Sequence, residues 1–426
     1  MSSFKFIHAA DLHIESPYKG ISHLNQELGR ALVNYGIQAY EKLIETCIDE
    51  KIDFLLIAGD SFDSDAGSLS AQYRFVKGLE VLKKANISVF IICGNHDPLN
   101  NWSSHLTFPD NVTLFEGETV QQHTVFKEKS AVAEIYGVSY SKKEEFRNLA
   151  EQYERNDQAE FAIGLLHGTM AGRETKTPYC PFDMDSLRAS NMDYWALGHI
   201  HKREVVSDKN PMVVYPGNIQ GRHFNETGEK GCSLVYVEEG AVKNHDFISL
   251  SNVVFDYKTI DVTNLESLSA FFNAVEDLKN ELLKSDQSHL LRIQLKGKTP
   301  LHQVFSRRAQ IEELISDFNN ENSYQNSFVF IDKIINLTKP VIDLEERKKS
   351  NDFIGDLIAR FDDYAKDPKA MIKLKDSVME EMMSTKVGRH LNNEAFEEEI
   401  LNEFGDILNT AKWKCIDGLI NNESKE

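Results

Sequence analysis

The chain has 426 residues, of which 41% are hydrophobic, and its formal net charge at pH 7 is −20. A chain of this length exceeds what one hydrophobic core usually supports, so we expect two or three folded domains and exclude a disordered protein. The acidic balance counts against a protein that grips nucleic acid by itself through clusters of lysine and arginine.

Two further features bear on the setting of the protein. No apolar run approaches the length of a membrane span, and the opening MSSFKFIHAADLH lacks the basic region and long apolar segment of a secretory signal. The cysteines are scattered and odd in number, and their spacing matches neither a disulfide framework nor a zinc ribbon: Cys47, Cys93, Cys180, Cys232 and Cys415. We therefore expect free thiols, a cytoplasmic protein and no association with a membrane.

Short apolar runs alternate with amphipathic stretches in the first part of the chain. The runs at 4–10, 53–58 and 87–93 are rich in β-branched or aromatic residues, as buried strands are, and two more follow at 161–166 and 194–197. Between the first three runs, apolar residues recur at helical spacing: Leu32, Tyr35, Ala39, Leu43, Ile44 and Cys47, then Phe75, Leu79, Val81 and Leu82. This order predicts an α/β fold with a sheet core and flanking helices.

Each of the five apolar runs ends in residues of kinds that bind metal ions. The endings are Asp11-Leu12-His13, Gly59-Asp60, Gly94-Asn95-His96-Asp97, His167 and Gly198-His199-Ile200-His201. Loops at the carboxyl ends of strands in an α/β sheet converge on one crevice, so we expect these side chains to share a pocket. Carboxylates suit hard divalent ions, and imidazoles favour manganese, iron or zinc. The pattern predicts a two-metal phosphoesterase in which Asp60 bridges ions about 3.5 to 4 Å apart.

The ordered set DxH, GDxFD, GNHD, LLHG and GHIH resembles the motifs of the calcineurin-like metallophosphoesterases. The longer segments HAADLHIESPYKG, DYWALGHIHKRE and YPGNIQGRHFNETGEKG are similar to the SbcD-type nucleases of DNA double-strand-break repair, and the opening looks most like the bacterial YhaO-type exonucleases. The resemblance covers residues 1–250 strongly and the remainder only in layout. It implies a metal-dependent DNA nuclease that acts in DNA end processing and repair.

The resemblance also implies a role for each motif residue. One ion would be held by Asp11, His13, Asp60 and His201, and the other by Asp60, Asn95, His167 and His199. His96 would be catalytic, since a histidine beside the scissile phosphate can stabilise developing charge or protonate the leaving oxygen. Asp63 would orient His96, although some relatives carry histidine at that position. Two divalent ions per chain are implied, with manganese favoured over iron, zinc or magnesium.

Several residues near these motifs have competing structural explanations. Tyr18 and Arg222 are candidate contacts for substrate phosphates, but solvated loop residues are equally expected there. Asp97 fits a turn residue, or a residue that supports the ligands, better than a ligand itself, and His8 and His223 are either structural or adjacent to the site. A small basic cluster could line the approach of DNA despite the net charge: Lys202, Arg203, Arg222 and Lys230.

Beyond residue 250 the sequence predicts two further regions. Residues 254–337 have the order strand, helix, strand, helix, strand, which is typical of a compact α+β module. In the resembling family a capping domain at this position orients DNA, and Arg307 and Arg308 are candidates for that contact, although a solvated helix face explains them equally well. We expect a nuclease domain over 1–250, the capping domain over 251–340 and a helical region over 341–426.

The helical region carries two apolar stripes at helical spacing, namely Ile354, Leu357, Ile358 and Phe361, and then Phe396, Ile400, Leu401, Phe404, Ile407 and Leu408. The stripes either pack on each other as a small bundle or dock a partner helix. In the resembling family the C-terminal helices bind an SMC-like ABC ATPase. The implied partners are therefore DNA, such an ATPase and a second copy of the chain.

Two other functions remain open. A calcineurin-like phosphatase or small-molecule phosphodiesterase would use the same GNHD-type motif. A DNA-end binding partner of an SMC-like ATPase would keep the site without depending on its chemistry, although no predicted ligand is missing from the sequence. The flanking segments and the added C-terminal regions favour the nuclease.

Overall fold

The computed structural model describes residues 3–16, 26–63, 68–101, 107–156, 159–172, 179–320, 327–350, 352–385 and 394–423. The chain divides into two compact units. The first comprises Met1–Tyr257, Lys279–Arg292 and Asn319–Asp332, and the second comprises Lys258–Leu278, Ile293–Phe318 and Lys333–Glu426. Among the described residues, no helix is both long and apolar enough to cross a membrane. The boundaries of the three expected domains stay predictions.

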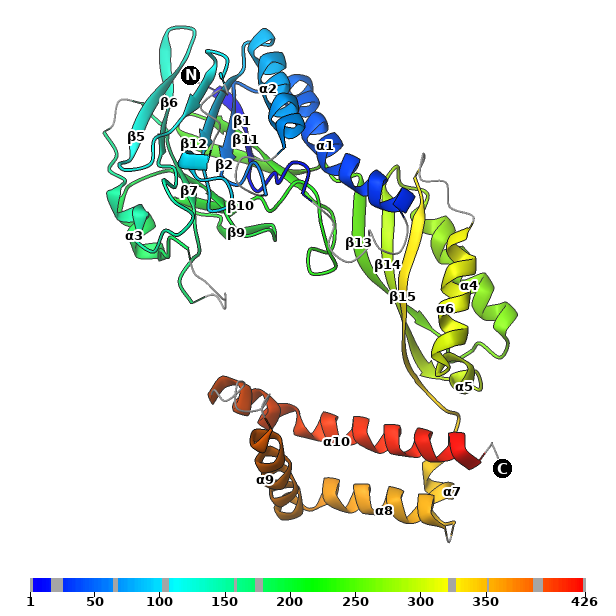
Figure 1. Cartoon of the computed structure of the whole chain (residues 1–426). Coiled ribbons are helices and arrows are strands. Elements are labelled where there is room, and N and C mark those ends of the chain that lie inside the picture. Colours follow the sequence, from blue (N-terminus) through cyan, green and yellow to red (C-terminus); the bar gives the residue numbers. More distant parts are fainter. Residues whose placement is uncertain are drawn as a thin grey trace. The chain divides into compact units, whose positions relative to one another are not determined.

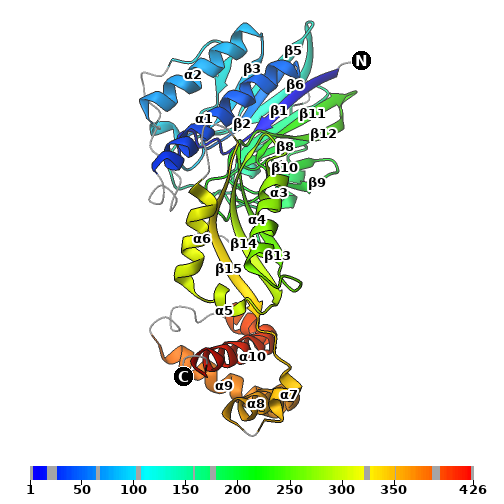
Figure 2. The ribbon, with the colours of Figure 1, turned by 90° about the vertical axis from the view of Figure 1, so that its right-hand side faces the viewer.

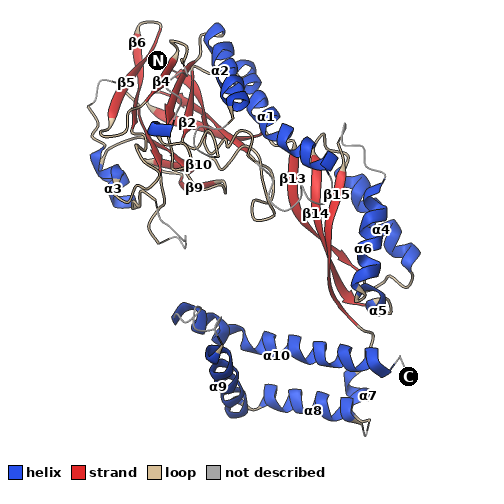
Figure 3. Ribbon diagram, in the orientation of Figure 1, coloured by secondary structure: helices blue, strands red, loops and turns tan. Residues whose placement is uncertain are grey.

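Two six-stranded sheets form the centre of the first unit (Figures 1 and 3). The first sheet consists, in spatial order, of β12 (Ala241–Ser249), β11 (Gly231–Glu238), β1 (Ser3–Ala9), β2 (Phe54–Ala58), β3 (Ser88–Ile92) and β4 (Val112–Leu114). The second consists of β5 (Gln121–Lys127), β6 (Ser130–Gly137), β7 (Ala162–His167), β8 (Tyr194–Gly198), β10 (Met212–Tyr215) and β9 (Glu204–Ser207). Strands β1 to β4 pair in parallel, as do β6, β7, β8 and β10.

The alternation of side chains along these strands builds the layers of the unit. Leu55 and Ile57 of β2 pack in the cluster that contains α1 (Gln26–Asp49) and α2 (Leu69–Lys84), whereas Phe54 and Leu56 pack toward the second sheet. Successive residues of a strand point to opposite faces, so each central strand is apolar on both faces. Figure 2 shows α1 and α2 side by side. The short helix α3 (Met184–Ala189) contributes Leu187 to the core beyond the second sheet.

The five predicted strands and both predicted helices of this unit are present. Helix α2 begins after Ser68, whose side chain accepts a hydrogen bond from the Ala71 N–H at 3.0 Å and so caps the helix. Phe75 and Leu79 are fully buried, but Val81 is 40% exposed and lies outside the apolar face. Two short 3-10 helices, η1 (Leu99–Asn101) and η2 (Leu149–Gln152), complete the unit. All five cysteines are free.

The expected strand–helix alternation after residue 250 is also present. It consists of β13 (Val253–Asp261), α4 (Leu268–Leu282), β14 (Ser288–Lys298), α5 (His302–Phe305), α6 (Arg308–Asn320) and β15 (Val329–Lys339), with the sheet order β13-β14-β15. The short α5 was not expected; its Phe305 packs on Phe271 of α4 with ring centroids 4.9 Å apart. The first residues of each strand belong to the first unit, where Phe255 and Phe328 join a cluster with Leu28 of α1.

The C-terminal region consists of α7 (Leu344–Lys348), α8 (Phe353–Lys366), α9 (Pro368–Ser384) and α10 (Glu394–Glu423). Ile354 and Ile358 of α8 pack with Ile416 of α10, and Asp362 of α8 forms an ion pair with Lys412 of α10. In the described part of the chain, the first stripe therefore packs on α10 at Ile416 and not at the second stripe, whose Ile407 is 44% exposed. That the two stripes pack on each other stays a prediction. The side chains of Phe396, Ile400 and Leu401 lie outside the described residues.

Gly198, at the carboxyl end of β8, has no space for a side chain. A Cβ added there would lie 1.8 Å from the carbonyl oxygen of Ala58 and 2.8 Å from Nδ1 of His167. We therefore expect Gly198→Ala to lower the free energy of unfolding by about 1–3 kcal/mol, because the two sheets must move apart to admit one methyl group. Differential scanning calorimetry of the whole chain measures this loss.

A matched control is the same substitution at Gly405 in α10, where an added Cβ meets no atom within 4 Å. Alanine replaces glycine favourably in a helix, so Gly405→Ala is expected to leave stability unchanged or raise it by about 0.5–1 kcal/mol. Equal stability of Gly198→Ala and the wild type would show that the sheet ends are not packed as described.

Candidate metal centre

The seven predicted metal ligands converge at the carboxyl ends of strands from both sheets. Asp11 and His13 follow β1, Asp60 follows β2, Asn95 follows β3, His167 ends β7, and His199 and His201 follow β8. Among the described residues, three groups of potential ligand atoms form: Asp11 with His13 and His201, Asp60 with His167 and His199, and His13 with Asp63 and His96. The first two groups contain six of the seven predicted ligands. The expected pocket therefore lies where two sheets meet, not at the crevice of one sheet.

Several of these residues have backbone conformations that side-chain-bearing residues rarely adopt. The φ angles of Asp11, His13, Asp60 and His199 are 51°, 44°, 52° and 95°. Each such residue costs about 1–3 kcal/mol and persists only where its surroundings enforce it. Main-chain hydrogen bonds from Asp11 N to Gly59 O (3.0 Å) and from His13 N to Asp60 O (3.1 Å) hold the loops after β1 and β2 together. This clustering of strain is typical of a functional site.

Asp97 joins the same loops by a different route. Its carboxylate accepts hydrogen bonds from the backbone N–H groups of Asp60 (3.2 Å), Ser61 (2.8 Å) and Gly94 (2.9 Å). Burial and the neighbouring Asp60 raise the pKa of Asp97 to about 8, against the effect of these donors. Asp97 thus connects the GNHD loop to the GDSFD loop, which agrees with the second of the two roles expected for it, that of a residue that supports the ligands.

The first ligand group places two imidazole nitrogens against each other. Nε2 of His13 lies 3.2 Å from Nε2 of His201, and Nε2 of His201 lies 3.9 Å from Oδ1 of Asp11. Atoms that ligate one ion at 2.0–2.2 Å lie about 3.0–3.5 Å from one another. The distance between His13 and His201 lies within this range and that between His201 and Asp11 exceeds it by 0.4 Å, so a small shift of side chains would let the three hold one ion.

The second ligand group has comparable spacing. Oδ1 of Asn95 lies 3.1 Å from Nε2 of His167 and 3.0 Å from Nδ1 of His199. Oδ2 of Asp60 lies 3.4 Å from Nε2 of His167 and 3.8 Å from Nε2 of His13, so one carboxylate oxygen faces both groups. Nδ1 of His167 donates to the carbonyl oxygen of Ala58 at 2.9 Å, which leaves Nε2 unprotonated in the neutral ring.

The electrostatics of the centre also favour bound cations. Burial raises the pKa of Asp11. Burial alone would raise the pKa of Asp60 too, but His167 and His13 hold it well below its usual range. In return, against the effect of burial, Asp60 and Asp11 raise the pKa of His167 to about 9. Buried carboxylates require compensating charge, and divalent ions would supply it without protonating a ligand. The donor set fits a pair of divalent ions.

His96 lies beside this cluster and is partly exposed. Its backbone N–H donates to Oδ1 of Asp60 (2.9 Å), and its ring centroid lies 5.1 Å from that of His13. Nδ1 of His96 donates to the backbone carbonyl of Asp63 (2.9 Å), whereas the carboxylate of Asp63 is 3.6 Å away. The main chain of Asp63 therefore makes the contact that we had expected from its side chain.

Of the two predicted substrate contacts, the structure describes only Arg222. Tyr18 lies outside the described residues. Arg222 is largely buried and donates to Asp63 Oδ1 (2.9 Å), Ser16 Oγ (3.2 Å) and Glu226 Oε1 (3.2 Å). Lys230 of the proposed basic cluster is 6% exposed and donates to the carbonyl oxygen of His201 at 3.1 Å. These two cations belong to the architecture of the centre, and a role in substrate binding stays a prediction for Arg222.

Of the two histidines left open by the sequence, His8 has a structural role. Nδ1 of His8 pairs with the hydroxyl of Tyr194 (3.1 Å) and Nε2 with the carbonyl oxygen of Leu197 (3.2 Å). Burial lowers the pKa of His8 to about 3, so the ring is neutral within the core between the sheets. His223 is partly exposed, with Nε2 3.5 Å from Oε1 of Glu226.

Sequence reasoning missed one residue of the centre. Oε1 of Glu226 accepts a hydrogen bond from Nδ1 of His201 at 2.6 Å. Glu226 lies in the segment YPGNIQGRHFNETGEKG that carried the family resemblance, yet nothing in its spacing from the GHIH motif marks it as a neighbour of His201. Only the fold of the intervening strands brings the two together.

Comparisons with known proteins agree with this geometry. A family model described as "Calcineurin-like phosphoesterase" matches residues 4–203. The metallophosphoesterase YhaO of Bacillus subtilis is 38% identical over 330 residues, which span 78% of this chain and 81% of that protein.

More distant similarity extends to proteins named "DNA double-strand break repair protein Mre11". The protein from Methanocaldococcus jannaschii is 23% identical over 65% of this chain and 74% of its own length. The protein from Sulfolobus acidocaldarius is 22% identical over 75% of this chain and 83% of its own length. Together with the ligand groups at the strand ends, these similarities establish that the chain belongs to the calcineurin-like metallophosphoesterase family.

Proposed function

We propose that this protein is a metal-dependent DNA nuclease that hydrolyses phosphodiester bonds, with exonuclease activity in DNA end processing and repair. The observation that carries the proposal is the pair of ligand groups that share Oδ2 of Asp60, with His96 beside them. The choice of DNA as substrate is supported by the similarity to Mre11 proteins over 65% and 75% of the chain.

In this proposal, most residues of the centre bind the metal ions and His96 transfers a proton. Asp11, His13 and His201 would hold one ion, Asn95, His167 and His199 the other, and Asp60 both. Ions bound there would make a shared water more acidic and neutralise charge on the phosphate. Because Nδ1 of His96 donates to the Asp63 carbonyl, Nε2 is the nitrogen that exchanges a proton with the leaving oxygen. We propose manganese as the native metal, since the centre mixes imidazole with carboxylate and amide oxygens.

We also propose that the protein acts together with other protein chains. The resemblance supports an SMC-like ABC ATPase and a second copy of this chain as partners. Helix α9 carries the apolar residues Met371, Ile372 and Val378, yet none of its described residues is buried. These apolar side chains support a role of the C-terminal region in binding a partner. The rival functions are a phosphatase or small-molecule phosphodiesterase, and a DNA-end binding protein without catalysis.

Metal loading is expected to stabilise the chain. After treatment with a chelator, added Mn²⁺ should bind at two ions per chain, because the two groups that contain the predicted ligands are joined by Asp60. Each site filled to about 100 times its dissociation constant adds about 2.7 kcal/mol to the stability of the unit that contains it. Metal analysis and calorimetry measure both effects, and a chain that retains no ion after manganese loading would contradict the metal centre.

His96→Ala is expected to lower DNA cleavage by about 10²–10⁴-fold while both ions remain bound, because His96 transfers protons and is not a ligand. Asp60→Ala should abolish cleavage together with binding of both ions. The assay uses duplex, hairpin and single-stranded ends with Mn²⁺ and with Mg²⁺.

The control for His96→Ala is His123→Ala on β5, which removes an imidazole on a strand that supplies no predicted ligand. Its cleavage rate should match the wild type. A manganese-loaded chain that leaves every DNA substrate intact but hydrolyses a phosphomonoester rapidly would select the phosphatase instead. A loaded chain that binds DNA ends without any hydrolysis would select the binding protein.

A further inference from the structure

Glu226 lies in the loop between β10 and β11, and several donors of the metal centre converge on its buried carboxylate. Oε1 accepts from Nδ1 of His201 (2.6 Å) and from Nη2 of Arg222 (3.2 Å). Oε2 accepts from the backbone N–H of Arg222 (2.8 Å) and from Nδ2 of Asn218 (3.0 Å). A carboxylate with four such contacts is fixed in position and orientation.

The contact with His201 determines which ring nitrogen carries the proton. Nδ1 of His201 lies 2.6 Å from Glu226 and 3.1 Å from Nη2 of Arg222. The shorter contact is to a carboxylate, which can only accept, so Nδ1 is protonated and donates to Glu226. In the neutral ring Nε2 then carries the lone pair, and this is the nitrogen that lies 3.2 Å from Nε2 of His13. Glu226 thereby presents the ligating atom of His201 to the centre.

Arg222 extends the contact to a second ligand of the same group. Its Nη1 donates to Oδ1 of Asp63 at 2.9 Å, and that oxygen lies 3.2 Å from Nδ1 of His13. Glu226, Arg222 and Asp63 therefore form a chain of alternating charge. It begins at the hydrogen bond with Nδ1 of His201 and ends at an ion-pair contact with Nδ1 of His13, which makes no hydrogen bond. The second ligand group is oriented differently, since Nδ1 of His167 donates to the main chain at Ala58.

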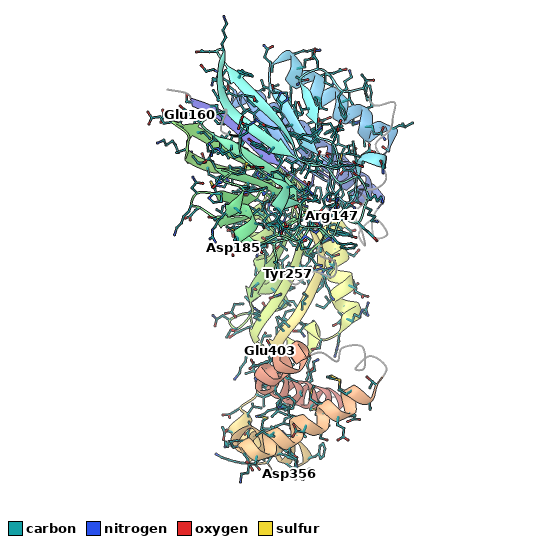
Figure 4. All side chains as sticks on the ribbon, turned by 90° about the vertical axis from the view of Figure 1, so that its left-hand side faces the viewer. Arg147, Glu160, Asp185, Tyr257, Asp356 and Glu403 are labelled. Atoms are coloured by element: carbon teal, nitrogen blue, oxygen red, sulfur yellow. The ribbon has the colours of Figure 1, made fainter. Side chains whose placement is uncertain are left out.

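The loop that carries Glu226 is anchored on its other side by Phe224. The ring of Phe224 packs against Phe255 with centroids 5.1 Å apart and against Tyr257 at 5.8 Å. The guanidinium of Arg292 lies 4.0 Å from the centroid of Phe224 and donates to the Tyr257 hydroxyl at 3.2 Å. Tyr257 is labelled in Figure 4. A loop held on both sides can position a ligand with little freedom.

We propose that Glu226 is a positioning residue that, through His201 and the Arg222–Asp63 pair, sets the affinity of one metal site, that of Asp11, His13, Asp60 and His201. The other site, held by Asp60, Asn95, His167 and His199, does not depend on it. This inference rests on the two-metal centre proposed above. The two ions would therefore differ in what secures their ligands, the first in a chain of ion pairs through Arg222 and the second in the main-chain hydrogen bond of His167.

The test is titration of the metal-free full chain with Mn²⁺, followed by calorimetry and by electron paramagnetic resonance. Removal of a residue that orients a ligand typically weakens metal binding by about 10- to 100-fold. We expect Glu226→Gln to weaken one of two sites by that factor and to leave the other at wild-type affinity. At manganese concentrations that fill only the tighter site, the spin-coupled signal of a manganese pair should give way to that of isolated Mn²⁺.

Two further variants separate positioning from general damage. Asn225→Ala changes an exposed neighbour in the same loop and should bind both ions as the wild type does. Asp63→Asn should weaken the same site as Glu226→Gln, and the double variant should lose less than the sum of the two effects, because both act through Arg222. Glu226→Gln keeps the shape of the side chain, so folding is expected to survive.

Each outcome bears on one proposal only. Wild-type affinity at both sites in Glu226→Gln, or equal weakening of both, would overturn the role of Glu226 while leaving the metal centre intact. A wild-type chain that binds no Mn²⁺ would instead reject the metal centre itself.

Discussion

The carboxylate of Asp60 is the interaction on which the rest of the centre depends. One oxygen accepts the backbone N–H of His96 at 2.9 Å, and the other faces His13 and His167 at 3.8 and 3.4 Å. The surrounding backbone leaves no spare room, since a Cβ added at Gly94 would lie 2.2 Å from Oδ1 of Asp60. A Cβ at Gly59 would lie 2.3 Å from Nδ1 of His167. The glycines of both motifs are therefore explained by close packing around one buried acid.

Placing this acid where two sheets meet makes the centre depend on the core between them. Phe6 and Phe54 stack with centroids 5.2 Å apart, and Phe6 meets Tyr194 of the opposite sheet edge-on at 5.2 Å. The hydroxyl of Tyr194 pairs with His8, three residues before Asp11. The packing that holds the sheets together is thus the packing that fixes the distances between the predicted ligands that follow β1 to β3 and those of β7 and β8.

Much of this arrangement could be predicted from local patterns, and the remainder could not for physical reasons. A strand that is buried on both faces has the same apolar texture in either sheet, so the runs ending at Asp60 and His167 gave no sign that they belong to different sheets. A sequence shows which residues are charged but not which groups they contact in the fold. Lys230 was expected on the approach surface and instead donates to the carbonyl of His201. Glu226 escaped notice because its role arises from a tertiary contact.

The acidic composition is compatible with a polyanionic substrate, because several acidic side chains lie in or beside the metal centre. Asp11 and Asp60 are buried in the centre, and Asp63 and Glu226 are paired with Arg222. Two divalent ions would carry four positive charges against the two negative charges of Asp11 and Asp60, which reverses the sign of the local field. Attraction of a phosphodiester to this centre would then depend on the bound ions rather than on surface lysines. A net charge of −20 would therefore weaken binding of DNA to the chain as a whole without opposing the binding of a phosphodiester at the centre.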